Sequence, residues 1–338
     1  MRKYFVLMIT LYFSASLSHA KLSKHNDAPK HTNVKILNWW SYLDDRVASD
    51  LKNNGFNLDV SIYHSNEVSL SRLLSKREHF DIAIVSNINL DILLKENIFD
   101  THALDQLSKK RNYIELITKG STCIPYLWGT TIFAYDSRVS TPPPRSLSAL
   151  VEMKKNGFAI GILDDPLETA ARLIGDNLED CGNKNLEKIF SQTKNCKDKL
   201  SEKFNIGLTP SDFMSTTDEF ITKPKTAIYG WQGSVFINLK NAPWLKFNLS
   251  SQHPVIGADY VCILKNRANK TTNINQLKKF VEILTNHKNT KANVESNQYF
   301  SPYQNDKEGL DPKVISLFDE LIELSKKTKP IYINTPTP

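Results

Sequence analysis

The chain has 338 residues, which is enough for two domains of ordinary size. Hydrophobic residues make up 40% of it and charged residues 23%, a composition typical of globular proteins and not of disordered ones. The formal net charge is +7, but the basic residues occur in short runs such as Lys109-Lys110-Arg111, without interleaved aromatic residues. This distribution is typical of solvated helix faces, so nucleic-acid binding is not predicted.

The first twenty residues have the pattern of a cleaved secretion signal. Arg2-Lys3 is followed by an apolar run over residues 4–17, and Ser18-His19-Ala20 matches a small-x-small cleavage site. The apolar run is too short to span a bilayer. The residue after the cleavage site is Lys21 and not cysteine, so a lipid anchor is not expected there. The sequence predicts export to the periplasm with removal of residues 1–20. An uncleaved N-terminal anchor is the alternative.

The four cysteines would meet oxidising surroundings after export. Cys181 and Cys196 flank a polar segment and could close a short loop. Cys123 and Cys262 lie in apolar runs and can pair only if their strands are neighbours; free buried thiols are the alternative. There is no Cys-x-x-Cys, and no histidine pair is spaced for one helix face. Neither a metal nor a cofactor is predicted.

Strands and helices alternate along the first part of the chain. We expect strands at 34–38, 58–63 and 80–85, and helices at 45–54, 68–75 and 90–96. The run at 80–85 is apolar almost throughout, which indicates a strand buried on both faces. The alternation is typical of a doubly wound parallel sheet.

The same pattern restarts after residue 135. The expected elements are helices at 146–156, 167–176, 274–286 and 314–326, and strands at 158–163, 226–230 and 255–264. We therefore expect a two-lobed α/β protein, with two doubly wound sheets joined by a hinge of strands near residues 130 and 260. The predicted division is 33–131 plus 260–300 for lobe 1, and 132–259 plus 301–330 for lobe 2.

Several aromatic and polar residues follow directly on these strands. Trp39 and Trp40 follow the first strand, Ser86 the third, Asp165 the strand at 158–163, and Trp231 the strand at 226–230. Ligands of doubly wound sheets bind at the carboxyl ends of the strands, so these residues are candidates for a binding site. For the two tryptophans the alternative is packing in the core.

Carboxylates accompany these aromatic residues. Asp165 and Glu168 would lie one helical turn apart and could converge on one cation; the alternative is a cap at a helix start. Asp259 interrupts the apolar run at 255–264, where a buried charge costs several kcal/mol unless it is paired. Its partner is either a cationic ligand or an internal lysine or arginine. Aromatic rings and carboxylates together suit a long organic polycation.

The motifs behind these residues resemble those of the spermidine/putrescine-binding proteins of bacterial polyamine ABC importers, from about Leu37 to Tyr303. The matching segments are Asn38-Trp39-Trp40-Ser41-Tyr42, Ser65-Asn66-Glu67, Phe80 to Ser86, Ile124 to Thr131, Asp164-Asp165 with Glu168, Gly230-Trp231, Asp259, and Tyr299-Phe300-Ser301-Pro302. The resemblance implies a periplasmic receptor that closes its lobes on a polyamine and presents it to a membrane permease. It also implies a monomer that does not change its ligand chemically.

The resemblance also assigns roles to residues. Trp39, Trp231 and Tyr299 correspond to aromatic walls of the cleft, and Ser86 to a polar contact. Trp40 stands where a small hydroxyl residue is usual. Asp165 and Glu168 correspond to the site for one terminal amine, and Asp259 to the partner of an inner or opposite amine.

Three positions depart from the family pattern. Ile88 stands where a stacking tyrosine is expected, Gly257 where a tryptophan usually lines the cleft, and Ser41 where an acid is common. Loss of two rings would weaken ring–cation attraction and widen the cleft. The ligand class is therefore predicted, but not the individual polyamine.

Two other functions are alternatives. The same fold could serve another cation or a sensory role. An exported hydrolase could use Asp165 and Glu168 as acid and base. The sequence has no Gly-x-Ser-x-Gly elbow and no phosphate-binding loop, so an enzyme is not predicted.

Overall fold

The computed structural model of the protein describes residues 31–75, 77–118, 122–139, 142–165, 172, 213–214, 223–238, 241–249, 253–265, 267–268, 272–328 and 331–332. The predicted signal segment, the helix expected at 167–176, Glu168, Cys181 and Cys196 lie outside these residues. No helix in the described part is long and apolar enough to cross a membrane.

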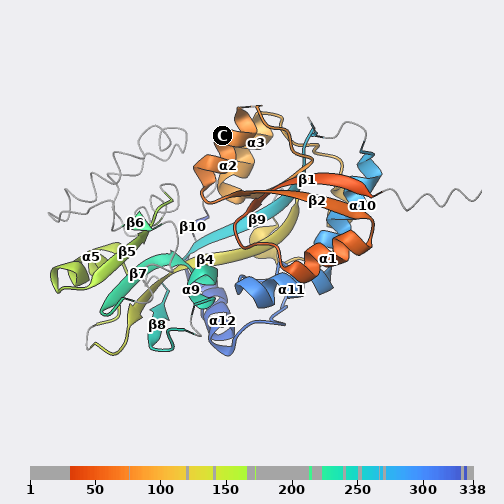
Figure 1. The fold of residues 1–338 in the computed structure, drawn as a ribbon. Helices are drawn as coiled ribbons and strands as arrows, with labels where there is room; N and C mark the ends of the chain where they lie inside the picture. The colour runs from red at the N-terminus through yellow and green to blue at the C-terminus, as the bar shows by residue number, and fades with distance from the viewer. Residues whose placement is uncertain are drawn as a thin grey trace, which may run out of the picture. The chain divides into compact units, whose positions relative to one another are not determined.

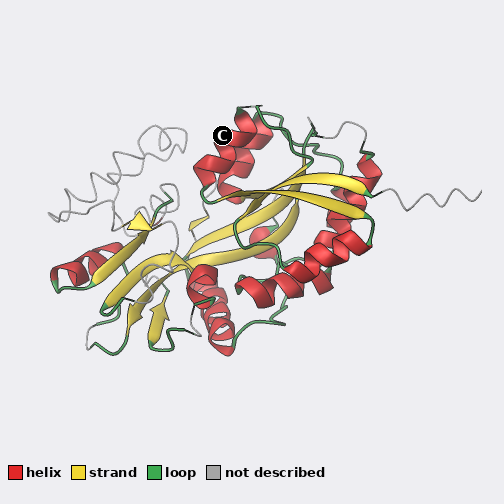
Figure 2. Ribbon diagram, viewed as in Figure 1, coloured by secondary structure: helices red, strands yellow, loops and turns green. Residues whose placement is uncertain are grey.

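Strands and helices alternate in the described part (Figures 1 and 2). The strands are β1 (Thr32–Trp39), β2 (Phe56–Tyr63), β3 (Ile82–Ser86), β4 (Ile124–Asp136), β5 (Ala159–Leu163), β6 (Phe213–Met214), β7 (Thr226–Trp231), β8 (Leu245–Asn248), β9 (Val255–Ile263) and β10 (Ile331–Tyr332). The helices are α1 (Asp45–Asn53), α2 (Asn66–Leu74), α3 (Asn87–Lys95), α4 (Asp105–Lys109), α5 (Leu147–Lys155), α9 (Gln232–Phe236), α10 (Ile274–Leu284), α11 (His287–Asn297) and α12 (Pro312–Lys327).

Helices α2 and α3, which follow β2 and β3, begin at polar capping residues. Ser65 caps α2 by accepting a bond from the backbone N–H of Val68, and Ser86 caps α3 by accepting one from Ile88. A side-chain oxygen at this position satisfies one of the backbone N–H groups that the first turn leaves unpaired. Ser86 is also the last residue of β3, so strand and helix meet there without a long loop.

The strands hydrogen-bond in the order β2-β1-β3-β9-β4-β7-β5-β6, with β10 beside β9 and β8 beside β4. The pairs of β1 with β2 and β3, and of β5 with β6 and β7, are parallel, as the alternation predicts. The sheet as a whole is mixed, because β9 runs antiparallel to β3 and β4, and β4 runs antiparallel to β7.

One long strand belongs to two groups of strands. β4 pairs with β9 over residues 124–130 and with β7 over residues 131–135. We call β1, β2, β3, β9 and β10 the first strand group, and β5, β6, β7 and β8 the second. The predicted α/β fold with a joining strand near residue 130 is confirmed, although the two groups are parts of one mixed sheet. The strand near residue 260, β9, pairs with β3, β4 and β10 and belongs to the first group. The lobe boundaries remain a prediction.

Helices cover both sides of the first strand group, α2 and α3 on one side and α1, α10 and α11 on the other (Figure 2). Residues 82–85 of β3 are fully buried, as the apolar pattern of that strand predicts. Burial on both faces follows, because neighbouring residues of a strand point to opposite sides of the sheet.

Cys123 and Cys262 form a disulfide. Cys123 directly precedes β4, Cys262 lies in β9, and their neighbours Ile124 and Val261 are paired across the two antiparallel strands. Their Cα atoms are 4.8 Å apart, and both residues are buried. The strands are therefore neighbours, and the two cysteines are paired and not free.

Candidate ligand-binding site

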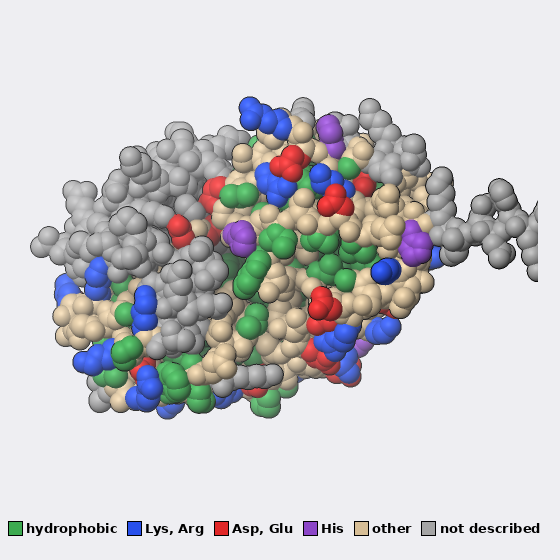
Figure 3. Space-filling model, in the orientation of Figure 1, with side chains coloured by type: hydrophobic (Ala, Val, Ile, Leu, Met, Phe, Trp, Pro, Cys, Tyr) green, Lys and Arg blue, Asp and Glu red, His purple; other side chains and the backbone are tan. Residues whose placement is uncertain are grey.

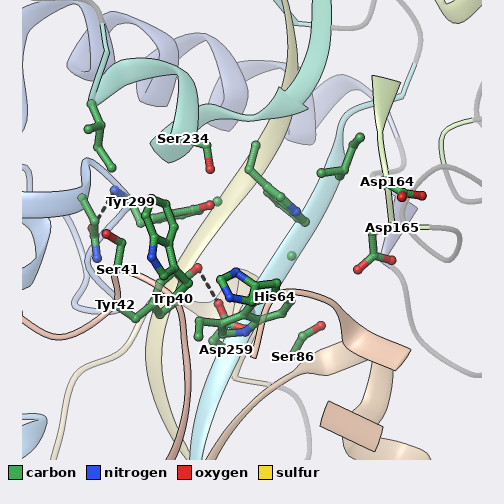
Figure 4. Close-up of a pocket in the computed structure, with 18 residues that line it drawn as sticks. Trp40, Ser41, Tyr42, His64, Ser86, Asp164, Asp165, Ser234, Asp259 and Tyr299 are labelled. Carbon is green, nitrogen blue, oxygen red and sulfur yellow. Dashed lines mark hydrogen bonds between the residues drawn. The ribbon is translucent and has the colours of Figure 1, made fainter. Parts of the chain in front are cut away.

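A pocket opens where β1, β3, β5 and β7 end (Figure 4). It encloses about 880 Å³, part of which is open to solvent. Residues of both strand groups line it, among them Ser41, Leu163 and Ile237. Of the residues predicted to bind ligand, seven line the pocket: Trp39, Trp40, Ser86, Asp165, Trp231, Asp259 and Tyr299. Glu168 lies outside the described residues.

The two tryptophans at the end of β1 have different surroundings. Trp39 is the last residue of the strand, and its ring centroid lies 4.3 Å from that of Tyr63, which is buried. Trp40 is 44% exposed, and its ring centroid lies 6.3 Å from that of His64. Trp39 therefore packs partly against the core, whereas Trp40 does not.

Asp259 lies in β9 opposite Ser86 of β3 and is almost completely buried. The indole Nε1 of Trp39 donates a 2.9 Å hydrogen bond to its Oδ1 atom. The hydroxyl of Tyr42 donates a 2.8 Å hydrogen bond to its Oδ2 atom. Each carboxylate oxygen thus has one neutral donor. Trp39 is the last residue of β1, and Tyr42 lies three residues after it.

Burial raises the pKa of Asp259 to about 7, although the bonds from Tyr42 and Trp39 act to lower it. No lysine or arginine among the described residues forms a salt bridge with this carboxylate. Of the two partners expected from the sequence, an internal cation is thus not found in the described part. A cationic ligand would supply the missing positive charge.

Tyr299 forms an aromatic wall beside this carboxylate. Its ring centroid lies 5.0 Å from that of Tyr42 and 6.5 Å from that of Trp231. A Cβ atom at Gly233 would lie 2.2 Å from Cε2 of Tyr299, and one at Gly129 would lie 2.9 Å from its Cδ1. The ring can occupy this place because glycine stands at both positions.

Trp231 lies against Gly257 in the same way. A Cβ atom at position 257 would come within 2.3 Å of Cη2 of the indole. The expectation that glycine widens the cleft here is wrong, because the ring of Trp231 occupies the space beside it. Ile88, a second of the three departures from the family pattern, is fully buried and does not line the pocket.

Asp165 lies two residues beyond β5 and is buried. Its Oδ2 atom accepts hydrogen bonds from the backbone N–H of Asn66, at 3.2 Å, and from the side-chain Nδ2 of Asn66, at 2.8 Å. Asp165 therefore meets the start of α2, 99 residues away in sequence. The capping alternative concerned the helix expected at 167–176, whose start lies outside the described residues.

The described lining is acidic and aromatic. Its carboxylates are Asp164, Asp165 and Asp259, and it contains no lysine or arginine. In Figure 4, Asp164 and Asp165 lie on one side of the pocket, Ser41 and Tyr299 on the other, and Asp259 between them. Such a lining suits a cation with an alkyl chain, because rings attract ammonium groups and cover methylene groups while carboxylates pair with the charges.

The described residues also include a group with the composition of a metal site, His287, Asp306 and Glu308, with ligand atoms within 4.8 Å of one another. None of them lines the pocket. Lys291 forms an ion pair with Glu308, which supplies a positive charge where a metal would be needed.

Some contributors were not singled out from the sequence. Tyr42 lies within a quoted motif, and the need of Asp259 for donors was the signal that could have identified it. His64 follows β2 and lines the pocket, and no local pattern points to it. Asn66 lies in the matched segment Ser65-Asn66-Glu67, but only the fold brings it to Asp165.

No protein-family model matches the chain. A norspermidine sensor of Vibrio cholerae is 29% identical over 118 residues, which cover 33% of this chain and 32% of the sensor. The putrescine-binding periplasmic protein SpuD of Pseudomonas aeruginosa is 26% identical over 112 residues, covering 30% of each chain. The chain thus matches about a third of the length of these relatives. They bear out its resemblance to polyamine-binding proteins.

Solved structures extend the similarity in fold over most of the chain. A putative spermidine/putrescine ABC transporter protein of Listeria monocytogenes has a TM-score of 0.65 at 16% identity, covering 88% of this chain and 99% of its own. A maltose/maltodextrin-binding domain of Bdellovibrio bacteriovorus has a TM-score of 0.66 at 12% identity, covering 90% and 89%. The fold is therefore that of the two-lobed periplasmic binding proteins. Since polyamine and sugar binders match about equally well, the fold alone does not select the ligand.

Proposed function

We propose that this protein is an exported receptor that binds a linear polyamine in the pocket and delivers it to the membrane permease of an ABC importer. The observation that carries the proposal is the buried carboxylate of Asp259, which has aromatic donors and no described cationic partner. A buried carboxylate in such a place is stabilised by a cation that enters with the ligand.

The rest of the lining supports a cation with more than one charge. Asp164 and Asp165 add two carboxylates on the side of the pocket away from Tyr299 (Figure 4). The rings of Trp39, Trp231 and Tyr299 would cover the methylene groups between the ammonium groups. The basic side chains visible in Figure 3 occur at several separate places on that face, so capture relies on the acidic lining and not on the charge of the whole chain.

The proposal includes release of the ligand without chemical change and action as a periplasmic monomer. The alternative, hydrolysis by paired carboxylates, would use Asp165 as acid or base. Oδ2 of Asp165 instead accepts two hydrogen bonds from Asn66, which tie this oxygen to the start of α2. Incubation with a labelled polyamine, followed by recovery of the intact compound from the heat-denatured complex, would separate the two.

A panel of ligands tests the proposed function. The melting temperature of the purified protein is measured with increasing putrescine, cadaverine, spermidine, norspermidine and spermine, and with maltotriose and thiamin as controls for the shared fold. A ligand that binds only the folded state must raise the melting temperature in a saturable manner. We expect such a rise with at least one polyamine and with neither control. No rise with any polyamine would contradict the proposal.

A sensory role is a second candidate, because the norspermidine sensor of Vibrio cholerae is among the relatives. Both roles need the same pocket, so binding does not distinguish them. Uptake of labelled spermidine by cells with and without a functional copy of this chain does: a receptor for import is required for uptake, and a sensor is not.

A further inference from the structure

Asn66 is the first residue of α2 and is fully buried. Its two hydrogen bonds to Asp165 start from the backbone N–H and from the side-chain amide, and both end on the same oxygen, Oδ2. The N-terminus of a helix favours a negative charge beside it, and a bond to an ionised acceptor is stronger than one between neutral groups. The contact therefore combines helix polarity with a side-chain donor.

This contact joins elements of the two strand groups. Asp165 follows β5 of the second strand group, whereas α2 covers the first group. Any opening of the pocket that separates these two elements breaks both bonds at once. The pair thus places a lining carboxylate and links the two strand groups.

Behind Asn66 lies a buried polar network that belongs to α2 and α3. The carbonyl oxygen of Asn66 accepts a 2.7 Å bond from Nδ2 of Asn89 and a 3.0 Å bond from the hydroxyl of Ser69. Nδ2 of Asn89 also donates to Ser69 Oγ at 2.8 Å. All three residues are fully buried, where a lost partner costs more than at the surface. Both bonds end on the backbone carbonyl of Asn66, so the network holds the backbone of this residue at the start of α2.

The same two helices reach the second carboxylate of the site. The side-chain oxygen of Asn87, the first residue of α3, accepts a 3.0 Å bond from the backbone N–H of Ala258, next to Asp259. Asp165 and Asp259 are thus both tied to the α2–α3 layer. The α2–α3 layer therefore contributes to the placement of both carboxylates, directly for Asp165 and through the backbone of Ala258 for Asp259.

We propose that Asn66 is a positioning residue that fixes the Asp165 carboxylate for one ammonium group of the ligand and links the two strand groups while the ligand is bound. The inference rests on the proposed function. It adds a residue that lies outside the pocket lining and acts through Asp165.

The first test is Asn66→Ala, studied by stopped-flow tryptophan fluorescence with spermidine, since Trp39 and Trp231 line the pocket. Loss of the side-chain donor should raise the dissociation rate about tenfold and leave the association rate within about threefold, because most changes in affinity at one interface appear in dissociation. A residue that only supports the fold would lower the melting temperature and leave both rates of the folded protein unchanged.

Asn289→Ala is the matched control. Asn289 is also a buried asparagine, and its Nδ2 donates a 2.9 Å bond to a carboxylate, but that carboxylate, Asp50, does not line the pocket as Asp165 does. The variant should lose stability without a change in spermidine kinetics. Asn66→Asp covers the case in which Asn66→Ala does not fold: an acid suits the start of α2 but repels Asp165, so spermidine should again dissociate faster.

A double-mutant cycle decides whether Asn66 acts through Asp165. In an Asp165→Ala background, Asn66→Ala should cause no further loss of spermidine affinity, so the two effects are strongly non-additive. Additive losses of spermidine affinity would overturn the inference, and so would equal spermidine rates in Asn66→Ala and Asn289→Ala. In either case, spermidine binding by the wild type would still support the proposed function. A wild-type protein that binds no polyamine would overturn both.

Discussion

Trp231 lies against Gly257 so closely that a methyl group at position 257 would come within 2.3 Å of the indole Cη2. Glycine is thus required there by the neighbouring ring, and not because the pocket needs more room. One aromatic wall of the pocket depends on a residue that has no side chain.

Gly257→Ala should therefore displace the ring of Trp231. The added Cβ atom would lie 2.3 Å from a non-bonded carbon of the ring, which is too close, so the ring or the strand must move. We expect polyamine affinity to fall about tenfold, since a displaced ring loses its contact with the ligand. Calorimetric titration measures the effect. In a Trp231→Ala background the added methyl group should have almost no effect; an equal loss there would show that Gly257 acts otherwise.

Asp259→Asn should affect stability and binding in opposite directions. The pKa of this carboxyl is raised from 3.8 to about 7, so ionisation of the ligand-free folded protein is unfavourable. Between these two values the unfolded state loses its proton first, and stability falls as pH rises. At pH 8 the cost is on the order of 4 kcal/mol, which a neutral asparagine avoids. We expect a higher melting temperature without ligand and weaker binding. A lower melting temperature at pH 8 would contradict this.

The affinity for polyamines should depend on pH through the same group. A cation binds the ionised carboxylate, so binding displaces the proton of Asp259 below its pKa of about 7. Affinity should fall by up to about tenfold for each unit below pH 7 and level off above it. Titration in buffers of different ionisation enthalpy counts the released proton. His64 also lines the pocket, so His64→Gln is the control. This variant should keep the pH dependence of the affinity, whereas Asp259→Asn should abolish it.

Ser41→Asp should shift preference toward ligands with three charges. Ser41 lines the side of the pocket opposite Asp164 and Asp165, and no carboxylate of the described lining lies beside it (Figure 4). Its backbone φ is +60°, a left-handed conformation that aspartate tolerates better than most residues. The affinity ratio of spermidine to putrescine should rise about tenfold. Ser41→Asn is the uncharged control; an equal shift in both variants would exclude a charge effect.

Removal of the buried disulfide should lower stability without removing binding. The bond between Cys123 and Cys262 closes a loop with a sequence separation of 139. A crosslink of this span is worth about 2–5 kcal/mol. We expect the double Cys→Ser variant to unfold at lower urea concentration, while its spermidine affinity at low temperature stays within about threefold. A loss of binding in the folded variant would show that the crosslink also positions Asp259.

Much of the pocket could be predicted because its residues stand at strand ends. Trp39, Ser86 and Trp231 are the last residues of their strands, and an apolar run followed by such a residue is a local signal. Asp259 was identified by a different signal, an acid inside an apolar strand. Both signals depend on periodicity, which a single sequence displays.

The parts that could not be predicted depend on contacts across the fold. Asn66 lies in the matched segment Ser65-Asn66-Glu67, but its contact with Asp165 joins residues 99 positions apart, and no local pattern predicts that contact. Helix α11 was missed because its buried residues include Asn289, Asn293 and Asn297, so it has no apolar stripe of helical period. The placement of Trp231 beside Gly257 also arises only when β7 and β9 come together around β4.

The most direct test of the central claim is isothermal titration of spermidine into the wild-type protein and Asp259→Asn at pH 8. The account predicts saturable binding at one site per chain in the wild type, and affinity at least about tenfold lower in the variant, because a cation that pairs with a buried carboxylate loses its partner. Equal affinity in the two proteins, or no binding to the wild type, would contradict it.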